Sequence, residues 1–136
     1  MIGVIDASAA VNLVLPGPIG AAVAAAVDGL ELCAPGIIDA EVASALARLE
    51  RTGDLLTLDA ARAVRLWKRL PVERFSMASL FADAWTARNA MRVADAFYIC
   101  LARRLDCPLI TCDGRLARTP GVGVPVTLVS YSGSTA

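Results

Sequence analysis

Residues 2–11 read IGVIDASAAV, and the fold of this chain can be worked out from them. Residues 2–5 form a short apolar run that ends at an acidic residue, a pattern that favours a buried strand. Asp6 follows at once, and residues 7–15 after it have the composition of a helix. A buried strand followed by an acid and a helix opens a βα unit, so we expect a parallel sheet.

The rest of the chain repeats this alternation. Further strands are expected over residues 30–34, 72–76, 108–112 and 124–130, and further helices over residues 18–28, from a first turn containing Pro35 to a stop at Gly53, from Thr57 to Pro71, and over 79–90 and 93–105. Strands that alternate with helices predict a parallel sheet covered on both faces. We therefore predict an α/β fold of three layers with a short, mainly parallel sheet of four or five strands. It forms one domain over residues 1–131, followed by a loose tail at 132–136.

Length and composition narrow the class of protein. The chain has 136 residues, of which 57% are hydrophobic and 19% charged, and its mean hydropathy is +0.60. These values exclude an intrinsically disordered protein. They also leave more apolar surface than a small monomer easily hides, so we expect a partner or a dimer. Thirteen basic and thirteen acidic residues cancel, so no overall basic charge marks a nucleic-acid binder.

The sequence contains no histidine. Its absence excludes Ser-His-Asp and Cys-His catalysis and leaves metal chemistry to carboxylates. The four cysteines include no C-x-x-C pair, and we expect them to be buried thiols in a reducing, cytoplasmic compartment. Residues 7–27 carry no charge, but Pro16, Gly17 and Pro18 interrupt them, so we expect two short helices and no membrane span.

Four acidic residues stand out because apolar residues surround them, where an unpaired charge is expensive. Asp6 and Asp113 each follow an expected strand, and ligands of parallel sheets bind beyond such strand ends. Simpler interpretations are a helix cap for Asp6 and a turn for Asp113. Glu41 lies at the edge of the apolar stripe of its helix, whereas Asp39 is rotated away from it. Asp95 lies near the start of a largely apolar helix, whose dipole compensates its charge only in part, so Asp95 needs a cation.

Together the four acids predict a metal site. Clustered carboxylates without histidine suit Mg²⁺ or Mn²⁺, which prefer oxygen ligands. Such a metal can activate water, neutralise phosphate oxygens and stabilise a leaving oxyanion, and hydrolysis of a phosphodiester needs all three. The residues therefore favour phosphodiester chemistry.

The sequences around these acids resemble PIN-domain ribonucleases, in particular the VapC-type toxins of bacterial toxin–antitoxin pairs. The matching stretches are VIDASAAV around Asp6, APGIIDAEVASAL around Glu41, RVADAFYICLA around Asp95 and LITCDGRL around Asp113. They stand in the family's order over residues 2–117. The resemblance implies a three-layer PIN-like fold and metal-dependent cleavage of RNA. It also implies a homodimer and a cognate VapB-type antitoxin.

The resemblance implies roles for single residues as well. The catalytic, metal-binding residues would be Asp6, Glu41, Asp95 and Asp113. Ser8 and Thr111 match supporting hydroxyls, although a helix cap and an ordinary strand residue are alternatives. Arg115 and Arg118 are candidates for holding the RNA backbone, and a solvated surface role fits them as well. Residues 114–118 lack the further acid or Asn of many relatives, which leaves one metal or two open.

Two other interpretations stay open. A receiver-type phosphoacceptor domain also gathers acids at strand ends, but it needs a lysine after a late strand, and Lys68 falls inside an expected helix. A catalytically inactive PIN-like module, acting by dimerisation and partner binding, is the main alternative because the apolar excess suits it equally. Loss of RNA integrity that depends on metal and stops in EDTA distinguishes the enzyme from the module.

Overall fold

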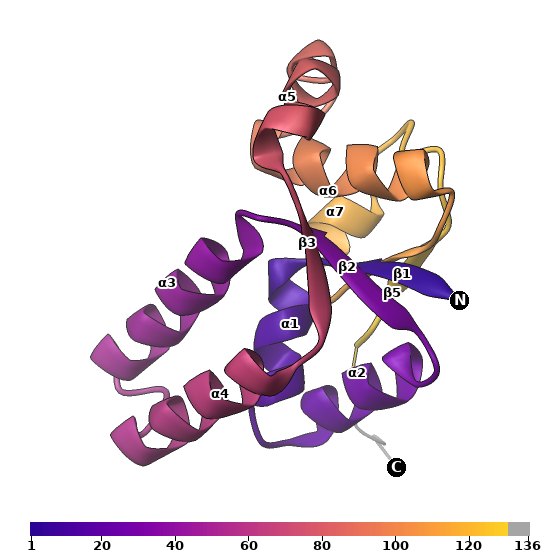
Figure 1. Ribbon diagram of the computed structural model, residues 1–136. Helices are drawn as coiled ribbons and strands as arrows, with labels where there is room; N and C mark the ends of the chain where they lie inside the picture. The colour runs from indigo at the N-terminus through magenta and orange to yellow at the C-terminus, as the bar shows by residue number, and fades with distance from the viewer. Residues whose placement is uncertain (131–136) are drawn as a thin grey trace.

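A computed structural model describes residues 1–130 (Figure 1). Its strands are β1 (Ile2–Ile5), β2 (Glu31–Pro35), β3 (Val72–Phe75), β4 (Leu109–Thr111) and β5 (Val126–Leu128). Its helices are α1 (Ala7–Val14), α2 (Pro18–Val27), α3 (Ile38–Arg51), α4 (Thr57–Arg69), α5 (Met77–Thr86), α6 (Val93–Leu105) and α7 (Gly114–Ala117). The predicted α/β fold is confirmed, whereas the predicted tail at 132–136 lies outside the described residues.

The five strands form one sheet in the order β3-β2-β1-β4-β5, and every pairing is parallel. The chain starts at the centre, adds β2 and β3 on one side, and then returns to add β4 and β5 on the other. Right-handed crossovers therefore place α1–α4 on one face of the sheet and α5–α7 on the opposite face (Figure 1). The strand order reverses between β1 and β4, which is where ligands of such sheets bind.

The core lies between the central strands and the helices on both faces. Val4 and Ile5 of β1 and Leu109 and Ile110 of β4 are at most 1% exposed. All residues of α6 from 96 to 102 are buried, in keeping with its largely apolar sequence. α6 contacts β1, β2 and β4, so it holds its first turn over the switch point of the sheet.

The predicted break between the first two helices is confirmed. α1 ends at Val14 and α2 begins at Pro18, after Gly17 with a φ of 125°. The two helices then pack tightly, because a Cβ at Gly20 would lie 2.5 Å from the Asn12 carbonyl oxygen. Among residues 1–130, no single helix is long and apolar enough to cross a membrane. α1 and α2 have that length and composition only as a pair, and they are bent by 116°.

The structure corrects the prediction that Pro35 lies in the first turn of a helix. Pro35 is the last residue of β2, where it pairs with Phe75, and the Gly36 N–H donates to the Phe75 carbonyl at 2.9 Å. The helix α3 begins three residues later, at Ile38. Proline lacks a donor but tolerates a strand end, so the sequence there is compatible with both structures.

Candidate active site

A pocket of about 140 Å³ lies beyond the carboxyl ends of β1 and β4. Its lining includes all four acids singled out from the sequence: Asp6, Glu41, Asp95 and Asp113. They arrive from the end of β1, from α3, from α6 and from the end of β4. The structure therefore brings the four candidates to one place, as expected for acids that follow neighbouring parallel strands.

Asp6 is held rigidly at the end of β1. Its side chain is the N-cap of α1, and its Oδ1 accepts the Ala9 N–H at 2.9 Å and the Ser8 hydroxyl at 2.7 Å. Its Oδ2 accepts the Thr111 hydroxyl. Asp6 is only 5% exposed, and this burial raises its pKa despite the three hydrogen bonds, which act in the opposite direction. Asp6 is thus both a helix cap and a wall of the pocket.

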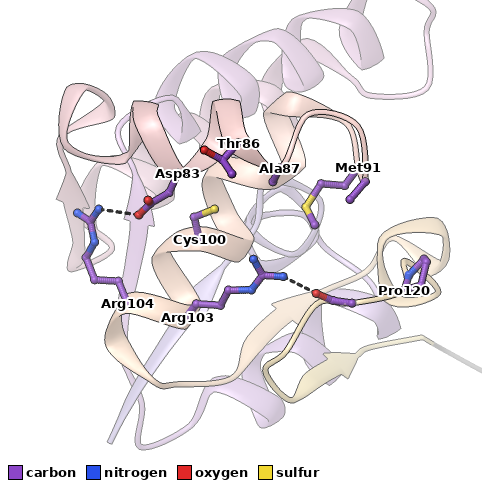
Figure 2. A pocket seen from close by; sticks show the side chains of 10 residues that line it. Asp83, Thr86, Ala87, Met91, Cys100, Arg103, Arg104 and Pro120 are labelled. Carbon is purple, nitrogen blue, oxygen red and sulfur yellow. Dashed lines mark hydrogen bonds and ion pairs between the residues drawn. The ribbon is translucent and has the colours of Figure 1, made fainter.

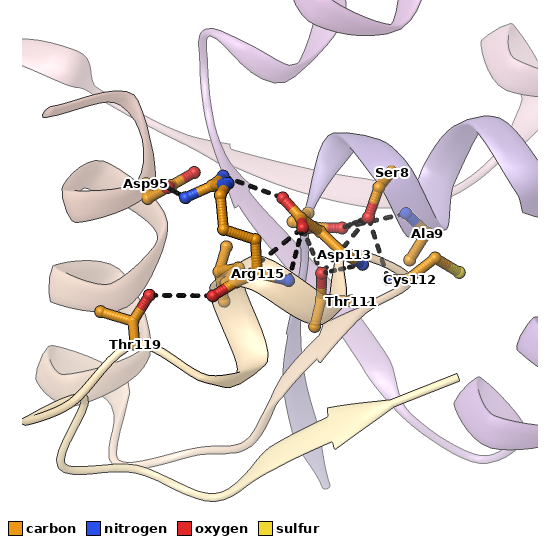
Figure 3. Close-up of polar contacts among 10 residues, drawn as sticks. Ser8, Ala9, Asp95, Thr111, Cys112, Asp113, Arg115 and Thr119 are labelled. Atoms are coloured by element: carbon orange, nitrogen blue, oxygen red, sulfur yellow. Dashed lines mark hydrogen bonds and ion pairs between the residues drawn. The ribbon is translucent and has the colours of Figure 1, made fainter. Parts of the chain in front are cut away.

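Ser8 and Thr111 join the ends of β1 and β4 through their hydroxyls (Figure 3). Ser8 Oγ accepts the Cys112 N–H at 2.9 Å and lies 3.3 Å from Thr111 Oγ1. Thr111 Oγ1 accepts the Asp113 N–H at 2.9 Å. Each hydroxyl therefore contacts Asp6 and also fixes the backbone that leads to Asp113. This geometry fits the predicted supporting role better than a simple cap or strand residue.

The cation that Asp95 was expected to need is Arg115. One guanidinium nitrogen of Arg115 lies 2.9 Å from Asp95 Oδ2, and another lies 2.9 Å from Asp113 Oδ2 (Figure 3). Asp113 also caps the short helix α7 by accepting the Arg115 and Leu116 N–H groups. The hydrogen bond to Asp95 is the largest cause of the raised pKa of Arg115. Arg118, by contrast, is exposed and makes no ion pair with the residues described.

Glu41 receives a hydrogen bond from α6. The Tyr98 hydroxyl donates to Glu41 Oε1 at 2.6 Å, and Tyr98 is 3% exposed. Burial and the adjacent Glu41 raise the pKa of Tyr98, so the phenol stays protonated and remains a donor. Tyr98 is a site residue that the sequence analysis did not select. Its signal was the spacing of three from Asp95, which puts both on one face of α6.

We expect Tyr98→Phe to lower the free energy of unfolding by about 1 kcal/mol, because phenylalanine fills the same volume but cannot donate to Glu41. Urea denaturation measures this change. The control is the same substitution in a Glu41→Ala protein, where the donor has already lost its acceptor and the change should nearly vanish. An equal loss in both backgrounds would show that the hydrogen bond contributes nothing.

Arg92 is a second residue that the sequence analysis missed. It is the N-cap residue of α6, it is exposed, and it lines the pocket. Within residues 1–130 its side chain has no hydrogen-bond or ion-pair partner. A basic side chain at a helix start is unfavourable for the helix dipole. This unfavourable charge, three residues before Asp95, is the feature of the sequence that could have identified Arg92 as a site residue.

Asp39 belongs to a different contact. It accepts the Trp67 indole N–H at 2.9 Å and pairs with Arg74 at 2.9 Å, and Arg74 also stacks over Trp67. The hydrogen bond from Arg74 is the main reason that the pKa of Asp39 is lowered. Asp39 therefore ties α3 to α4 and β3 and does not line the acidic pocket, in agreement with its weaker candidacy.

The donor set of the pocket fits a hard divalent cation, since it consists of carboxylate and hydroxyl oxygens. In the described arrangement of residues 1–130, however, no three acidic or cysteine side chains surround one point as metal ligands. In this arrangement Arg115 pairs with Asp95 and Asp113, and Tyr98 donates to one oxygen of Glu41. A metal at this position would therefore have to compete with Arg115 for Asp95 and Asp113.

A larger pocket of about 580 Å³ lies between α5, α6 and the segment at 120–121 (Figure 2). Its arginines are already bound: Arg103 donates to the Gly121 and Val122 carbonyls, and Arg104 pairs with Asp83 at 3.3 Å. Asp83 is the one acid in its lining. This pocket therefore lacks the carboxylate cluster on which the chemistry depends. All four cysteines are free thiols, and Cys33, Cys100 and Cys107 are buried as predicted, whereas Cys112 is only partly buried.

Comparisons with known proteins identify the family of this chain. The PIN domain family matches residues 3–122. Ribonuclease VapC12 of Mycobacterium tuberculosis is 39% identical over 127 residues, which cover 93% of this chain and 98% of that protein. Ribonuclease VapC3 of the same organism is 40% identical over 116 residues, 85% of each protein. The crystal structure of VapBC2 from Rickettsia felis bound to a DNA fragment from the VapBC2 promoter is similar in fold, with a TM-score of 0.69. The match covers 96% of this chain and all of the other chain, at 11% identity. With its acids gathered at the switch point of the sheet, the chain belongs to the PIN-domain family and, within it, to the VapC ribonucleases.

Proposed function

We propose that this chain is the ribonuclease toxin of a toxin–antitoxin pair and that it hydrolyses RNA phosphodiester bonds with Mg²⁺ or Mn²⁺. The observation that carries the proposal is that all four acids line one pocket, in a chain without histidine. The metal-binding residues would be Asp6, Glu41, Asp95 and Asp113. The relatives named ribonucleases, at 39–40% identity, support RNA as the substrate.

The residues of the pocket would have different roles in the reaction. A bound metal supplies an activated water and charge stabilisation for the phosphate. Ser8 and Thr111 fix the Asp6 carboxylate, and Tyr98 fixes Glu41, so neither acid loses much side-chain freedom when it binds a cation. Arg92 stands exposed at the rim, where it can hold a phosphate next to the scissile bond.

A groove for the neighbouring nucleotides continues from the acidic pocket. A second pocket of about 550 Å³ between α1 and α3 shares Ala7, Ser8 and Glu41 with it. Arg48 lines this groove and is exposed. An RNA strand that enters along α3 would thus meet one basic side chain before the acids and Arg92 beyond them.

The proposal includes partners. Exposed apolar side chains on α5 and at the start of α4 provide surface for a second copy and for a VapB-type antitoxin: Phe81 is 61%, Trp85 54%, Leu56 71% and Leu58 83% exposed. The crystal structure of VapBC2 supports an antitoxin complex as the working assembly. A cytoplasmic location remains part of the prediction. An inactive interaction module is the less favoured function, because it gives no reason for four acids to share one pocket.

We expect the purified chain to cut RNA in Mg²⁺ or Mn²⁺, to stop when EDTA removes the metal, and to resume when metal is added back. Gel analysis of a defined RNA measures the cleavage. Asp95→Asn protein from the same purification controls for contaminating nucleases, since they would act in both samples. Equal cleavage with and without EDTA would contradict the proposed metal dependence, and a folded protein that never cuts RNA in either metal would favour the interaction module.

A further inference from the structure

We infer that Arg115 is a built-in competitor of the metal: its guanidinium occupies the position between Asp95 and Asp113, and a divalent cation must displace it to bind. The inference rests on the proposed function, because it concerns the regulation of the same site. It follows from which oxygens Arg115 binds and from how exposed each partner is.

One guanidinium bridges two acids that come from distant parts of the chain. Its Nη1 lies 2.9 Å from Asp95 Oδ2 on α6, and its Nη2 lies 2.9 Å from Asp113 Oδ2 beyond β4. Figure 3 shows the guanidinium between the two carboxylates. A positive group at this point lowers the repulsion between the acids, which is also what a metal would do there.

The guanidinium and a metal compete for these oxygens, because two positive groups at the same carboxylates repel each other. Asp113 Oδ1 accepts the Arg115 and Leu116 backbone N–H groups as the cap of α7, and Oδ2 is bound by the Arg115 side chain. Both oxygens of Asp113 are therefore engaged while Arg115 is in place. A cation that takes Asp113 Oδ2 as a ligand approaches the position of the guanidinium, and the repulsion between the two charges favours its displacement.

The solvent exposure of the two side chains makes an exchange of Arg115 for a metal feasible. The Asp95 side chain is only 13% exposed and needs a partner at all times, whereas the Arg115 side chain is 44% exposed. Arg115 can turn its side chain into solvent without moving α7, because the cap of that helix uses Asp113 Oδ1 and the Arg115 backbone N–H, whereas the guanidinium binds the other oxygen, Oδ2. The site then has two states, one with arginine and one with metal. The apparent metal affinity is the intrinsic affinity multiplied by the fraction of protein in which Arg115 has left the two acids.

The test compares Arg115→Gln with Arg118→Gln. Arg118 lies at the other end of α7, is exposed, and carries the same charge without contacting either acid. Isothermal titration calorimetry of the metal-free proteins with Mn²⁺ measures their affinity for the metal without any RNA. We expect Arg115→Gln to bind Mn²⁺ roughly 5- to 30-fold more tightly than the wild type, from the loss of two half-exposed ion pairs. Arg118→Gln should stay within about twofold, because a distant exposed charge is screened.

Thermal unfolding gives a second, independent readout. In EDTA, Arg115→Gln should unfold at a lower temperature than the wild type, because Asp95 and Asp113 lose their shared cation. At saturating Mn²⁺ the difference should vanish or change sign. A loss of the same size in both conditions would show that Arg115 is merely structural and overturn the inference.

The outcomes also separate this inference from the proposed function. If the wild type binds Mn²⁺ and Arg115→Gln binds it no more tightly, the exchange is refuted while the metal site stands. If neither protein binds Mn²⁺, the proposed metal-dependent function fails, and the inference fails with it.

Discussion

Asp95→Asn should lower RNA cleavage by at least about 100-fold while leaving a folded protein. Asparagine keeps the shape of the side chain but removes the charge that a cation needs, and each 1.36 kcal/mol of lost transition-state stabilisation lowers the rate tenfold. The same substitution breaks the ion pair with Arg115. Because Arg115 is 44% exposed and keeps its contact to Asp113, the free energy of unfolding should fall by about 1 kcal/mol or less.

Both effects can be measured on one preparation, by cleavage of a defined RNA in Mn²⁺ and by urea denaturation in EDTA. The matched control is Asp83→Asn, which removes an acid paired with Arg104 outside the acidic pocket and should cut RNA at the wild-type rate. A folded Asp95→Asn protein with wild-type activity would end the catalytic assignment of Asp95. A loss above roughly 3 kcal/mol, with activity lost only through unfolding, would make Asp95 a structural residue.

Asp6→Ala should be the most destabilising single change in the pocket, lowering the free energy of unfolding by roughly 2–4 kcal/mol. It removes the cap of α1, and it leaves the Ala9 N–H and the buried Thr111 hydroxyl without their acceptor. Asp6→Asn retains an oxygen that can accept the Ala9 N–H, so it should lose less than half as much.

Cleavage should nevertheless fall alike in both Asp6 variants, because neither offers a carboxylate. The pair thus separates the two tasks of Asp6, which chemical denaturation and the cleavage assay report independently. If Asp6→Ala unfolds at the urea concentration of the wild type, the hydrogen-bond network does not stabilise the fold as described. If Asp6→Asn cuts RNA normally, the carboxylate is not needed.

Much of the architecture could be predicted from the sequence because local patterns determine it. The apolar run at 2–5 and the Pro-Gly-Pro break each specify their element without help from the rest of the chain. The convergence of Asp6 and Asp113 was predictable for a related reason: the carboxyl ends of parallel strands share one edge of a sheet. Neither argument needs the order of the strands.

The pairings within the site could not be predicted, because they depend on that order. Ser8 contacts Thr111 because β4 lies beside β1. Arg115 reaches Asp95 because α6 packs against both of these strands. The short helix α7 could not be predicted from the sequence, because four residues are too few to show a helical period. From the sequence, Arg115 was a candidate contact for the RNA backbone or a solvated surface residue, and its ion pairs with Asp95 and Asp113 appear only in the structure.

The hydrogen bonds from Ser8 and Thr111 to Asp6 determine when the pocket can form during synthesis of the chain. Thr111 and Asp6 are 105 positions apart, so the first acid is made long before the hydroxyl that fixes it. At about 5–20 residues per second, synthesis of the intervening chain takes roughly 5 to 20 s. A nascent chain on the ribosome therefore carries an incomplete pocket until its last third emerges. The four acids can share one pocket only after residues 95–113 have been synthesised and have joined the sheet.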